Sequence, residues 1–205
     1  MEEDKEKSSR NPFIAILIFI VLFVMPAGAL YFLNAGKNFR EEYMEELGNL
    51  GRMAPFQYDN QDNLPISQEV MKGRVSVVNF LTGNPADDKA KSERIAKVHQ
   101  SFDDTEDVLF LSFIPVDSSA SLRDEASRLV ITDNKQWYLV GTPKGDWERL
   151  AKENFKMTDP ANEVALVDTT LTIRNIYKIN EDESMGKLVV HVSMVIPKQK
   201  KRTGF

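Results

Sequence analysis

The residues with the clearest potential for chemistry follow an apolar run at 75–81, in a loop that reads TGNPA at 82–86. Asn84 lies in this loop, and Asp87 and Asp88 come directly after it. Their amide and carboxylate oxygens are ligands that suit Ca²⁺ or Mg²⁺, whereas Cu(I) prefers sulfur. One hypothesis for this stretch is therefore an oxygen-ligated metal site built from these three side chains.

The same stretch also has the composition of a helix start, and this is the interpretation we favour. Asn84 is among the best N-cap residues, because its side-chain oxygen accepts hydrogen bonds from the first N–H groups of a helix. Pro85 suits the first helical position, since its φ is already set and its missing N–H would have no partner there. Asp87 and Asp88 would then lie in the first turn, where the helix dipole favours negative charge by about 0.3–1 kcal/mol.

The chain has two histidines, which limits the other candidate sites. His191 and Met194 are three residues apart in a predicted helix. This spacing places an imidazole and a thioether on one side and defines a candidate weak copper site. A histidine beside core positions is more often a packed residue, and we favour that interpretation for His191. His99 falls on the charged side of its helix, and we expect it to be solvated.

Cysteine is absent from all 205 residues, and this excludes several chemistries at once. Disulfides, thiolate nucleophiles, cysteine-ligated zinc, iron–sulfur clusters and the lipid-modified cysteine of a lipoprotein are ruled out. The sequence has no Ser-His-Asp pattern, nucleophile elbow or glycine-rich phosphate loop, so we expect that the protein is not an enzyme. The formal net charge of −5 argues against nucleic acid as a partner, because duplex binding needs a clustered basic face.

An uncharged stretch of 22 residues, 12–33, predicts a transmembrane anchor behind a short tail at 1–11. An α-helix needs about 20 residues to cross the hydrocarbon core of a bilayer. A cleaved signal ending near AGA at 27–29 is the alternative, but LYFL at 30–33 continues the apolar run and suits a membrane interface. We therefore expect a single retained anchor. The flanking basic residues do not decide its orientation, and we expect the domain behind it to be exported.

Behind the anchor, hydrophobic periodicity predicts one α/β domain at 54–197, preceded by a spacer or short juxtamembrane helix within 34–53 and followed by a basic tail at 198–205. Strands are expected at 75–81, 108–116, 137–140, 164–167 and 171–177, the last two as a hairpin. Helices are expected at 86–102, 121–132, 146–155 and 181–196. This order implies a sheet with parallel and antiparallel pairs and helices on both faces.

Three details of the predicted helices are specific. The helix at 86–102 has three charge pairs spaced for exposed ion pairs, which are Asp87–Lys91, Lys89–Glu93 and Glu93–Lys97. The helix at 121–132 includes Val130 among its apolar positions. The helix at 146–155 is expected to begin at an acidic cap, Asp146.

An ordered series of segments resembles the Sco/SenC family of thioredoxin-fold proteins. APFQYDNQDNLPISQEVMKGRVSVVNFLTGNP at 54–85 is similar to the family's extended lead-in, Lys/Gly pair, strand ending in Asn-Phe, and active loop. LFLSFIPVDSS at 109–119 resembles its strand ending in Val-Asp-Pro, although VDSSAS at 116–121 lacks the proline. NKQWYLVGTPKGDWERLAKENFKM at 134–157 and VALVDTTLTIRNIY at 164–177 resemble its tryptophan-containing strand and its hairpin. The resemblance implies a thioredoxin-like fold.

Members of this family carry a Cys-x-x-x-Cys in the loop after the strand, and a distant histidine. They are associated with copper delivery to, or thiol reduction of, cytochrome c oxidase during its assembly. Position by position, the resemblance puts Asn84 at the first cysteine and Asp88 at the second. Pro160, or a residue close to it such as Asn162, stands at the histidine. Every ligand of the family's chemistry is therefore replaced, and we expect no copper or other cofactor.

Together these observations predict a membrane-anchored, Sco-like protein without thiol redox or cysteine-based copper chemistry. We expect it to bind a protein partner, and the resemblance suggests a respiratory oxidase subunit during assembly, with the domain on the periplasmic side. Two alternatives stay open. One is a copper carrier that uses non-thiol ligands, and the other is a structural subunit of an envelope complex.

Overall fold

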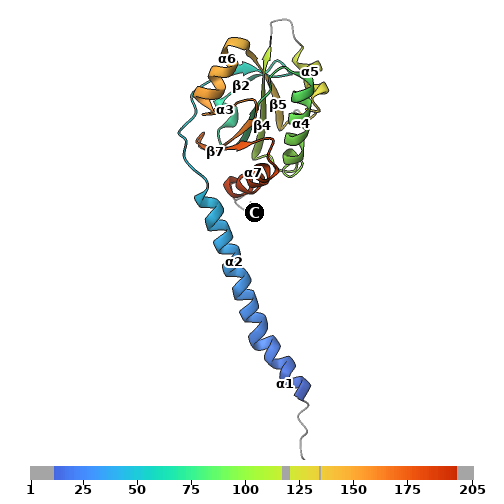
Figure 1. Cartoon of the computed structure of the whole chain (residues 1–205), viewed down its shortest axis with the longest axis vertical. Coiled ribbons are helices and arrows are strands. Elements are labelled where there is room, and N and C mark those ends of the chain that lie inside the picture. Colours follow the sequence, from blue (N-terminus) through green and yellow to red (C-terminus); the bar gives the residue numbers. More distant parts are fainter. Residues whose placement is uncertain (1–11, 117–120, 134, 198–205) are drawn as a thin grey trace, which may run out of the picture. The chain divides into compact units, whose positions relative to one another are not determined.

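Figure 1 shows the protein as a computed structural model. The residues that it describes are 12–116, 121–133 and 135–197. The chain divides into two units, an N-terminal helical unit that ends at Glu45 and a globular unit that begins at Glu46. The predicted tails at 1–11 and 198–205 lie outside the described residues.

The N-terminal unit is a run of helix made of three consecutive elements. They are α1 (Pro12–Phe19), a π-helical turn η1 (Ile20–Val24) and α2 (Met25–Glu45). Large apolar side chains along this run are exposed, for example Leu22 at 60% and Phe23 at 61%. Water disfavours such a surface and lipid would cover it. Within the described residues this is the one helix long and apolar enough to span a membrane, although a signal sequence has the same properties.

The stretch behind the apolar segment was predicted as a spacer or short juxtamembrane helix within 34–53, and its first part is continuous with the apolar helix. Helix α2 continues through it without a break and ends at Glu45. Two i,i+4 contacts support the continuation, an ion pair of 3.6 Å between Lys37 and Glu41 and a ring contact of 4.4 Å between Phe39 and Tyr43. The polar part of α2 is therefore an extension of the apolar helix.

The first residues of the globular unit also differ from the predicted spacer. Leu47 and Met53 are buried, and the N–H of Leu50 donates to the carbonyl of Ile173 at 2.9 Å. Buried apolar side chains and a backbone hydrogen bond fix this segment to the domain. The folded domain therefore begins at Glu46, earlier than the predicted start at 54.

The globular unit contains two sheets. Its strands are β1 (Gln57–Asp59), β2 (Pro65–Ser67), β3 (Val75–Phe80), β4 (Val108–Val116), β5 (Trp137–Pro143), β6 (Glu163–Val167) and β7 (Ile173–Lys178). Strands β1 and β2 form a small antiparallel pair, and the others form a mixed sheet in the order β5-β4-β3-β6-β7. Central strand β3 is parallel to β4 and antiparallel to β6. The α/β class and the mixed sheet predicted from the sequence are confirmed.

Helices cover both faces of the five-stranded sheet. They are α3 (Gln68–Met71), α4 (Pro85–His99), α5 (Leu122–Arg128), α6 (Lys144–Arg149) with its π-helical continuation η2 (Leu150–Asn154), and α7 (Asp182–Val195). Figure 1 shows α4 and α5 on one side of the sheet and α3 and α6 on the other. The strand residues alternate accordingly, so the molecule has an apolar core on each face.

The two cores have different contents. Val75 and Val77 of β3 point into a core that Ile95 of α4 and Leu188 of α7 complete. On the opposite face, Val78 and Phe80 point into a core shared with α6 and η2, where the rings of four phenylalanines lie 5.0–6.1 Å apart. Burial on both faces explains why β3 is apolar except at Ser76 and Asn79 and shows no regular alternation of apolar and polar residues.

Two predicted helices differ in detail from those observed. The helix expected at 121–132 ends at Arg128, and Val130 lies outside it with a φ of +62° and 47% of its surface exposed. The placement of Val130 in an apolar helix face was therefore wrong. The helix expected to begin at Asp146 begins at Lys144, because Pro143 with its preset φ precedes it, and Asp146 lies in the first turn.

Candidate functional site

The α4 loop (residues 82–84) connects the end of central strand β3 to the start of α4. Because β3 is parallel to β4 and antiparallel to β6, the loop lies at the carboxyl ends of the parallel strands, beside the position where the pairing changes. Open α/β sheets bind their ligands outside the carboxyl ends of their parallel strands. Gly83 allows the turn with a φ of +82°, in the left-handed region that favours glycine.

Asn84 is the N-cap residue of α4 in the structure. Its Oδ1 accepts a hydrogen bond from the N–H of Ala86 at 3.2 Å, and its Nδ2 donates to Oδ2 of Asp87 at 2.8 Å. Pro85 occupies the first turn, where a missing N–H costs nothing. The residue that the resemblance puts at the family's first cysteine therefore starts a helix.

Asp88 is the most constrained residue of the region. Its side chain is fully buried, and its two oxygens accept three hydrogen bonds from the α4 loop. Oδ1 accepts from the N–H of Thr82 at 2.8 Å and from its hydroxyl at 3.1 Å, and Oδ2 accepts from the N–H of Gly83 at 2.7 Å. The residue that the resemblance puts at the family's second cysteine thus fixes the loop backbone from inside. The sequence predicted only a favourable charge in the first turn.

Arg128 of α5 contacts the same region. Its Nη1 donates to the carbonyl of Pro85 at 3.2 Å, and its other nitrogens bond to Glu125. The hydrogen bond with Glu125 raises the pKa of the Arg128 guanidinium, and the charge of Asp88 acts in the same direction. This cation offsets part of the free-energy cost of burying the Asp88 carboxylate.

The oxygen-ligated metal site considered for Asn84, Asp87 and Asp88 does not fit this geometry. The Asp88 oxygens are directed at the loop backbone, and the Asn84 amide bonds to Ala86 and Asp87. A metal ion would have to break these bonds. Among the residues described, no group of three His, Cys, Asp or Glu side chains could hold a metal ion. Copper fits least, because it prefers sulfur and imidazole ligands.

The two candidates for the family's histidine position differ in placement. Pro160 is buried, whereas Asn162 lines a hollow next to the α4 loop. Oδ1 of Asn162 accepts from Nδ2 of Asn180 at 2.9 Å, and its own Nδ2 donates to Asp159 at 2.8 Å. The fold therefore brings Asn162, rather than Pro160, close to the α4 loop.

This hollow, which we name the Lys91 cleft, has a volume of about 370 Å³. It lies between the start of α4, the residues before β6 and the turn after β7. The charged and amide side chains that line it are Asp87, Lys91, Arg94, Asn162 and Asn180. The cleft combines the expected ligand-binding edge of the sheet with a lining rich in hydrogen-bond donors.

Lys91 was not recognised as a site residue from the sequence. The spacing predicted an exposed ion pair with Asp87, but Lys91 is only 9% exposed and Asp87 bonds to Asn84 instead. None of the three ion pairs predicted along α4 forms in the part of the chain that the structure describes. Helical periodicity could have indicated this burial. Lys91 precedes the buried Ile95 and Val98 by four and seven residues, which places it on the same face of α4.

His191 lies in a fully buried environment on α7. The Tyr177 hydroxyl and Nδ1 of His191 are 2.6 Å apart, and Nε2 lies 3.7 Å from a carboxylate oxygen of Glu46. Burial raises the pKa of Tyr177, and the charge of Glu46 adds to this, so the hydroxyl keeps its proton and can donate to Nδ1. Met194 is partly buried on the same helix. With both ring nitrogens facing Tyr177 and Glu46, this geometry does not favour the candidate copper site at His191 and Met194.

The prediction of a solvated His99 was wrong. Its side chain is 14% exposed, its Nε2 lies 3.1 Å from a carboxylate oxygen of Asp133, and its ring packs near Phe110 and Trp137. The physical reason is that the last turn of α4 lies over aromatic side chains of the sheet. A partly apolar imidazole is stabilised there by packing and by one polar contact.

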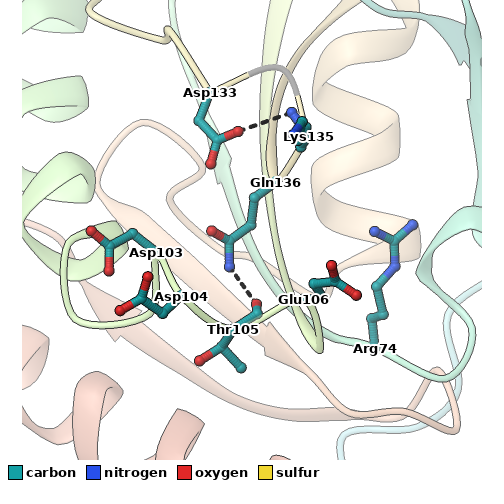
Figure 2. Close-up of a pocket in the computed structure, with 8 residues that line it drawn as sticks. All are labelled: Arg74, Asp103, Asp104, Thr105, Glu106, Asp133, Lys135 and Gln136. Carbon is teal, nitrogen blue, oxygen red and sulfur yellow. Dashed lines mark hydrogen bonds between the residues drawn. The ribbon is translucent and has the colours of Figure 1, made fainter.

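A larger hollow of about 550 Å³ lies at the opposite edge of the sheet (Figure 2). Its lining comes from the residues just before β3, β4 and β5, which are Arg74, Asp103, Asp104, Thr105, Glu106, Asp133, Lys135 and Gln136. Figure 2 shows the carboxylates spread around the rim, while Gln136 donates to the carbonyl of Thr105 at 2.7 Å. This hollow lies at the amino ends of the parallel strands, where ligand binding is not expected.

Comparison with known proteins bears on the fold. No family model matches the sequence, and no curated protein matches it. Solved structures do match. A SCO1/SenC family lipoprotein from Bacillus anthracis has 20% sequence identity and a TM-score of 0.58, and the match covers 73% of this chain and 98% of that one.

Two further solved structures that match this chain are also of Sco proteins. BsSco, a member of the Sco family of cytochrome c oxidase assembly proteins with a disulfide switch, has 18% identity and a TM-score of 0.60, over 74% of this chain and 98% of its own. ScoI from Bradyrhizobium japonicum, solved with copper bound, has 12% identity and a TM-score of 0.52. The match covers 71% of this chain and 99% of ScoI. The predicted thioredoxin-like fold, and the resemblance of that fold to the Sco/SenC family, are confirmed.

Proposed function

We propose that the protein is a membrane-anchored, Sco-like accessory factor that binds a protein partner and is not an enzyme. The observation that carries this proposal is the buried carboxylate of Asp88, which accepts three hydrogen bonds from the α4 loop. The resemblance puts the family's second cysteine at this residue. A side chain that fixes the backbone in this way is structural. The loop therefore presents a rigid surface rather than a reactive group.

The absence of thiol chemistry follows from composition. A dithiol–disulfide cycle needs two cysteines, and this sequence has none. Purified full-length protein in detergent is therefore expected to leave the rate of insulin reduction by dithiothreitol unchanged. An acceleration that depends on the protein concentration would contradict the proposal.

A role in assembly of a respiratory oxidase is the function that the similar structures suggest. BsSco is a member of a family of cytochrome c oxidase assembly proteins, and this chain shares its fold. We propose that this chain has neither thiol nor copper chemistry, and the contribution left to such a fold is then recognition of another protein. A single N-terminal helix that is long and apolar enough to span a membrane would hold the domain beside membrane-embedded partners, and we propose that the domain is exported.

The experiment that tests partner binding is site-specific photo-crosslinking in native membranes. A photoreactive amino acid is placed at Ala90, which is exposed and lines the Lys91 cleft, in the full-length chain. The matched control places it at Lys72, which is exposed and precedes β3 at the opposite edge of the sheet.

We expect a discrete crosslinked product from the Ala90 position and none from the Lys72 position. Mass spectrometry of the product then identifies the partner, and an oxidase subunit or assembly factor would support the finer proposal. The absence of any product at Ala90, or equal products at both positions, would contradict partner binding at this edge of the sheet.

A further inference from the structure

Lys91 combines a largely buried side chain with a charged end that faces a cleft. Its side chain is nine-tenths buried and lines the Lys91 cleft. Within the described residues its ammonium group has no hydrogen bond and no ion pair. The buried part of this side chain is its aliphatic stem, because Nζ is not among the fully buried atoms that lack a partner, and the ammonium group reaches the solvent of the cleft.

The neighbouring carboxylates do not supply the missing partner. Asp88, three residues before Lys91, is directed at the α4 loop. Asp87, four residues before it, accepts from the Asn84 amide. The positive charge of Lys91 is therefore available to a group that enters the cleft from outside.

The other polar groups of the cleft are mostly donors. Arg94 uses Nη1 to bond Asp182 at 2.7 Å, which leaves further N–H groups of its guanidinium for another acceptor. Asn180 donates to Asn162, and Asn162 donates to Asp159, so both amides are held in place. With Lys91 and Arg94 positive and Asp87 negative, the formal charge of the lining is +1.

We propose that the Lys91 cleft binds a carboxylate from an acidic, flexible segment of the protein partner, with Lys91 as its ion-pair partner. This inference rests on the proposed partner-binding function and names the chemistry of recognition. A single negative charge matches the +1 lining, whereas the double charge of a phosphate would meet the nearby carboxylate of Asp87 unfavourably. A volume of about 370 Å³ accommodates one acidic side chain with its backbone.

The test is an NMR titration of the isotope-labelled full-length protein in detergent micelles. The probe is the capped tripeptide acetyl-Gly-Glu-Gly-amide, and the matched control is acetyl-Gly-Gln-Gly-amide, which lacks the charge. Inorganic phosphate forms a third arm. Lys91→Met removes the charge but keeps the length of the side chain, and Lys89→Met makes the same charge change at an exposed position of α4.

We expect the glutamate peptide to cause saturable shifts of the Lys91 side-chain signals, and the glutamine peptide and phosphate to bind about tenfold more weakly or not at all. Lys91→Met should weaken glutamate-peptide binding about tenfold, and Lys89→Met less than about twofold. Equal binding by both variants would overturn the proposal, as would phosphate binding as strong as that of the glutamate peptide.

Two measurements keep this result separate from the partner-binding proposal. Thermal unfolding of both variants checks that Lys91→Met is folded. A loss of stability in Lys91→Met would mean that Lys91 has a structural contact, and this would overturn the inference.

Crosslinking from Ala90 in the Lys91→Met background distinguishes the carboxylate site from partner binding. A full yield of crosslinked product in that background would overturn the carboxylate site and leave partner binding intact, whereas the absence of product in the native background contradicts partner binding itself.

Discussion

Asp88 and Lys91 are buried charged residues within one turn of each other on α4, and their surroundings are opposite. Asp88 accepts three hydrogen bonds from the α4 loop and lies near the guanidinium of Arg128. Lys91 has no such partner among the described residues and faces a cleft. A buried charge with partners stabilises the fold, whereas the unpaired ammonium group of Lys91 reaches the cleft and is available to bind a ligand. Variants of these and other buried polar groups test this distinction.

The largest effect is expected for Asp88→Asn. The new amide nitrogen would face donors of the α4 loop, so the free energy of unfolding should fall by about 3 kcal/mol. Asp87→Asn, at an exposed position on the same turn, should change it by less than about 0.5 kcal/mol. Urea unfolding followed by circular dichroism measures both. Equal effects of the two substitutions would mean that Asp88 does not fix the loop.

A smaller loss is expected for Tyr177→Phe, which removes the contact between the tyrosine hydroxyl and His191. At pH 7 the free energy of unfolding should fall by about 1.5 kcal/mol, the cost of losing a buried hydrogen bond. Tyr138→Phe is the matched control, since that hydroxyl donates to a backbone carbonyl in an exposed position.

The Tyr177 contact also predicts a pH dependence. Burial raises the pKa of Tyr177, so above about pH 10 the unfolded chain loses the phenol proton while the folded chain keeps it. The folded state then binds more protons, and the stability of the native protein falls as the pH rises. Tyr177→Phe lacks this loss, so its stability gap to the native protein should narrow above about pH 10. Urea unfolding between about pH 9 and 11 measures this gap. A gap that widens over this range would contradict the raised pKa of Tyr177.

Asn84→Ala tests the cap alone. Loss of the N-cap oxygen should lower the free energy of unfolding by about 1 kcal/mol. Asn84→Asp keeps a capping oxygen and should retain most of the stability. If both substitutions have the same effect in urea unfolding, Asn84 contributes something other than a cap.

The smallest effect, and the only gain, is expected for Lys91→Met. The substitution keeps the buried aliphatic stem and removes a charge that has no partner, so the free energy of unfolding should rise by about 0.5 kcal/mol. Lys89→Met should be close to neutral because that side chain is exposed. A loss of stability in Lys91→Met alone would remove the contrast between Lys91 and Asp88.

The sequence predicted the sheet better than the site. Apolar runs located β3 and β4 to within one residue, because strands buried on both faces have no polar alternation to misread. Val130 was misplaced, since its apolar character gave no sign of a left-handed backbone after the helix. His99 was misplaced because its cover comes from Trp137 on a distant strand.

The helix start at Asn84 and Pro85 could be predicted because capping depends on neighbouring residues. The role of Asp88 could not, since the reversal at Gly83 that brings the loop N–H groups onto its carboxylate is a property of the folded backbone. The burial of Lys91 could not be predicted, because the rule for i,i+4 charge pairs considers only residues of the same helix. Its i,i+4 spacing from Asp87 indicated an exposed pair, and tertiary packing buried it instead.

The central claim, which belongs to the proposed function, is that the α4 loop holds a structural carboxylate where the resemblance to the Sco/SenC family expects thiol and copper chemistry. The most direct test is a Cu(I) competition titration of the full-length protein in detergent against a chelator of known affinity. We predict that the chelator keeps the copper at every protein concentration. Tight one-to-one transfer of copper to the protein, abolished by Asp88→Asn or by His191→Ala, would contradict the claim.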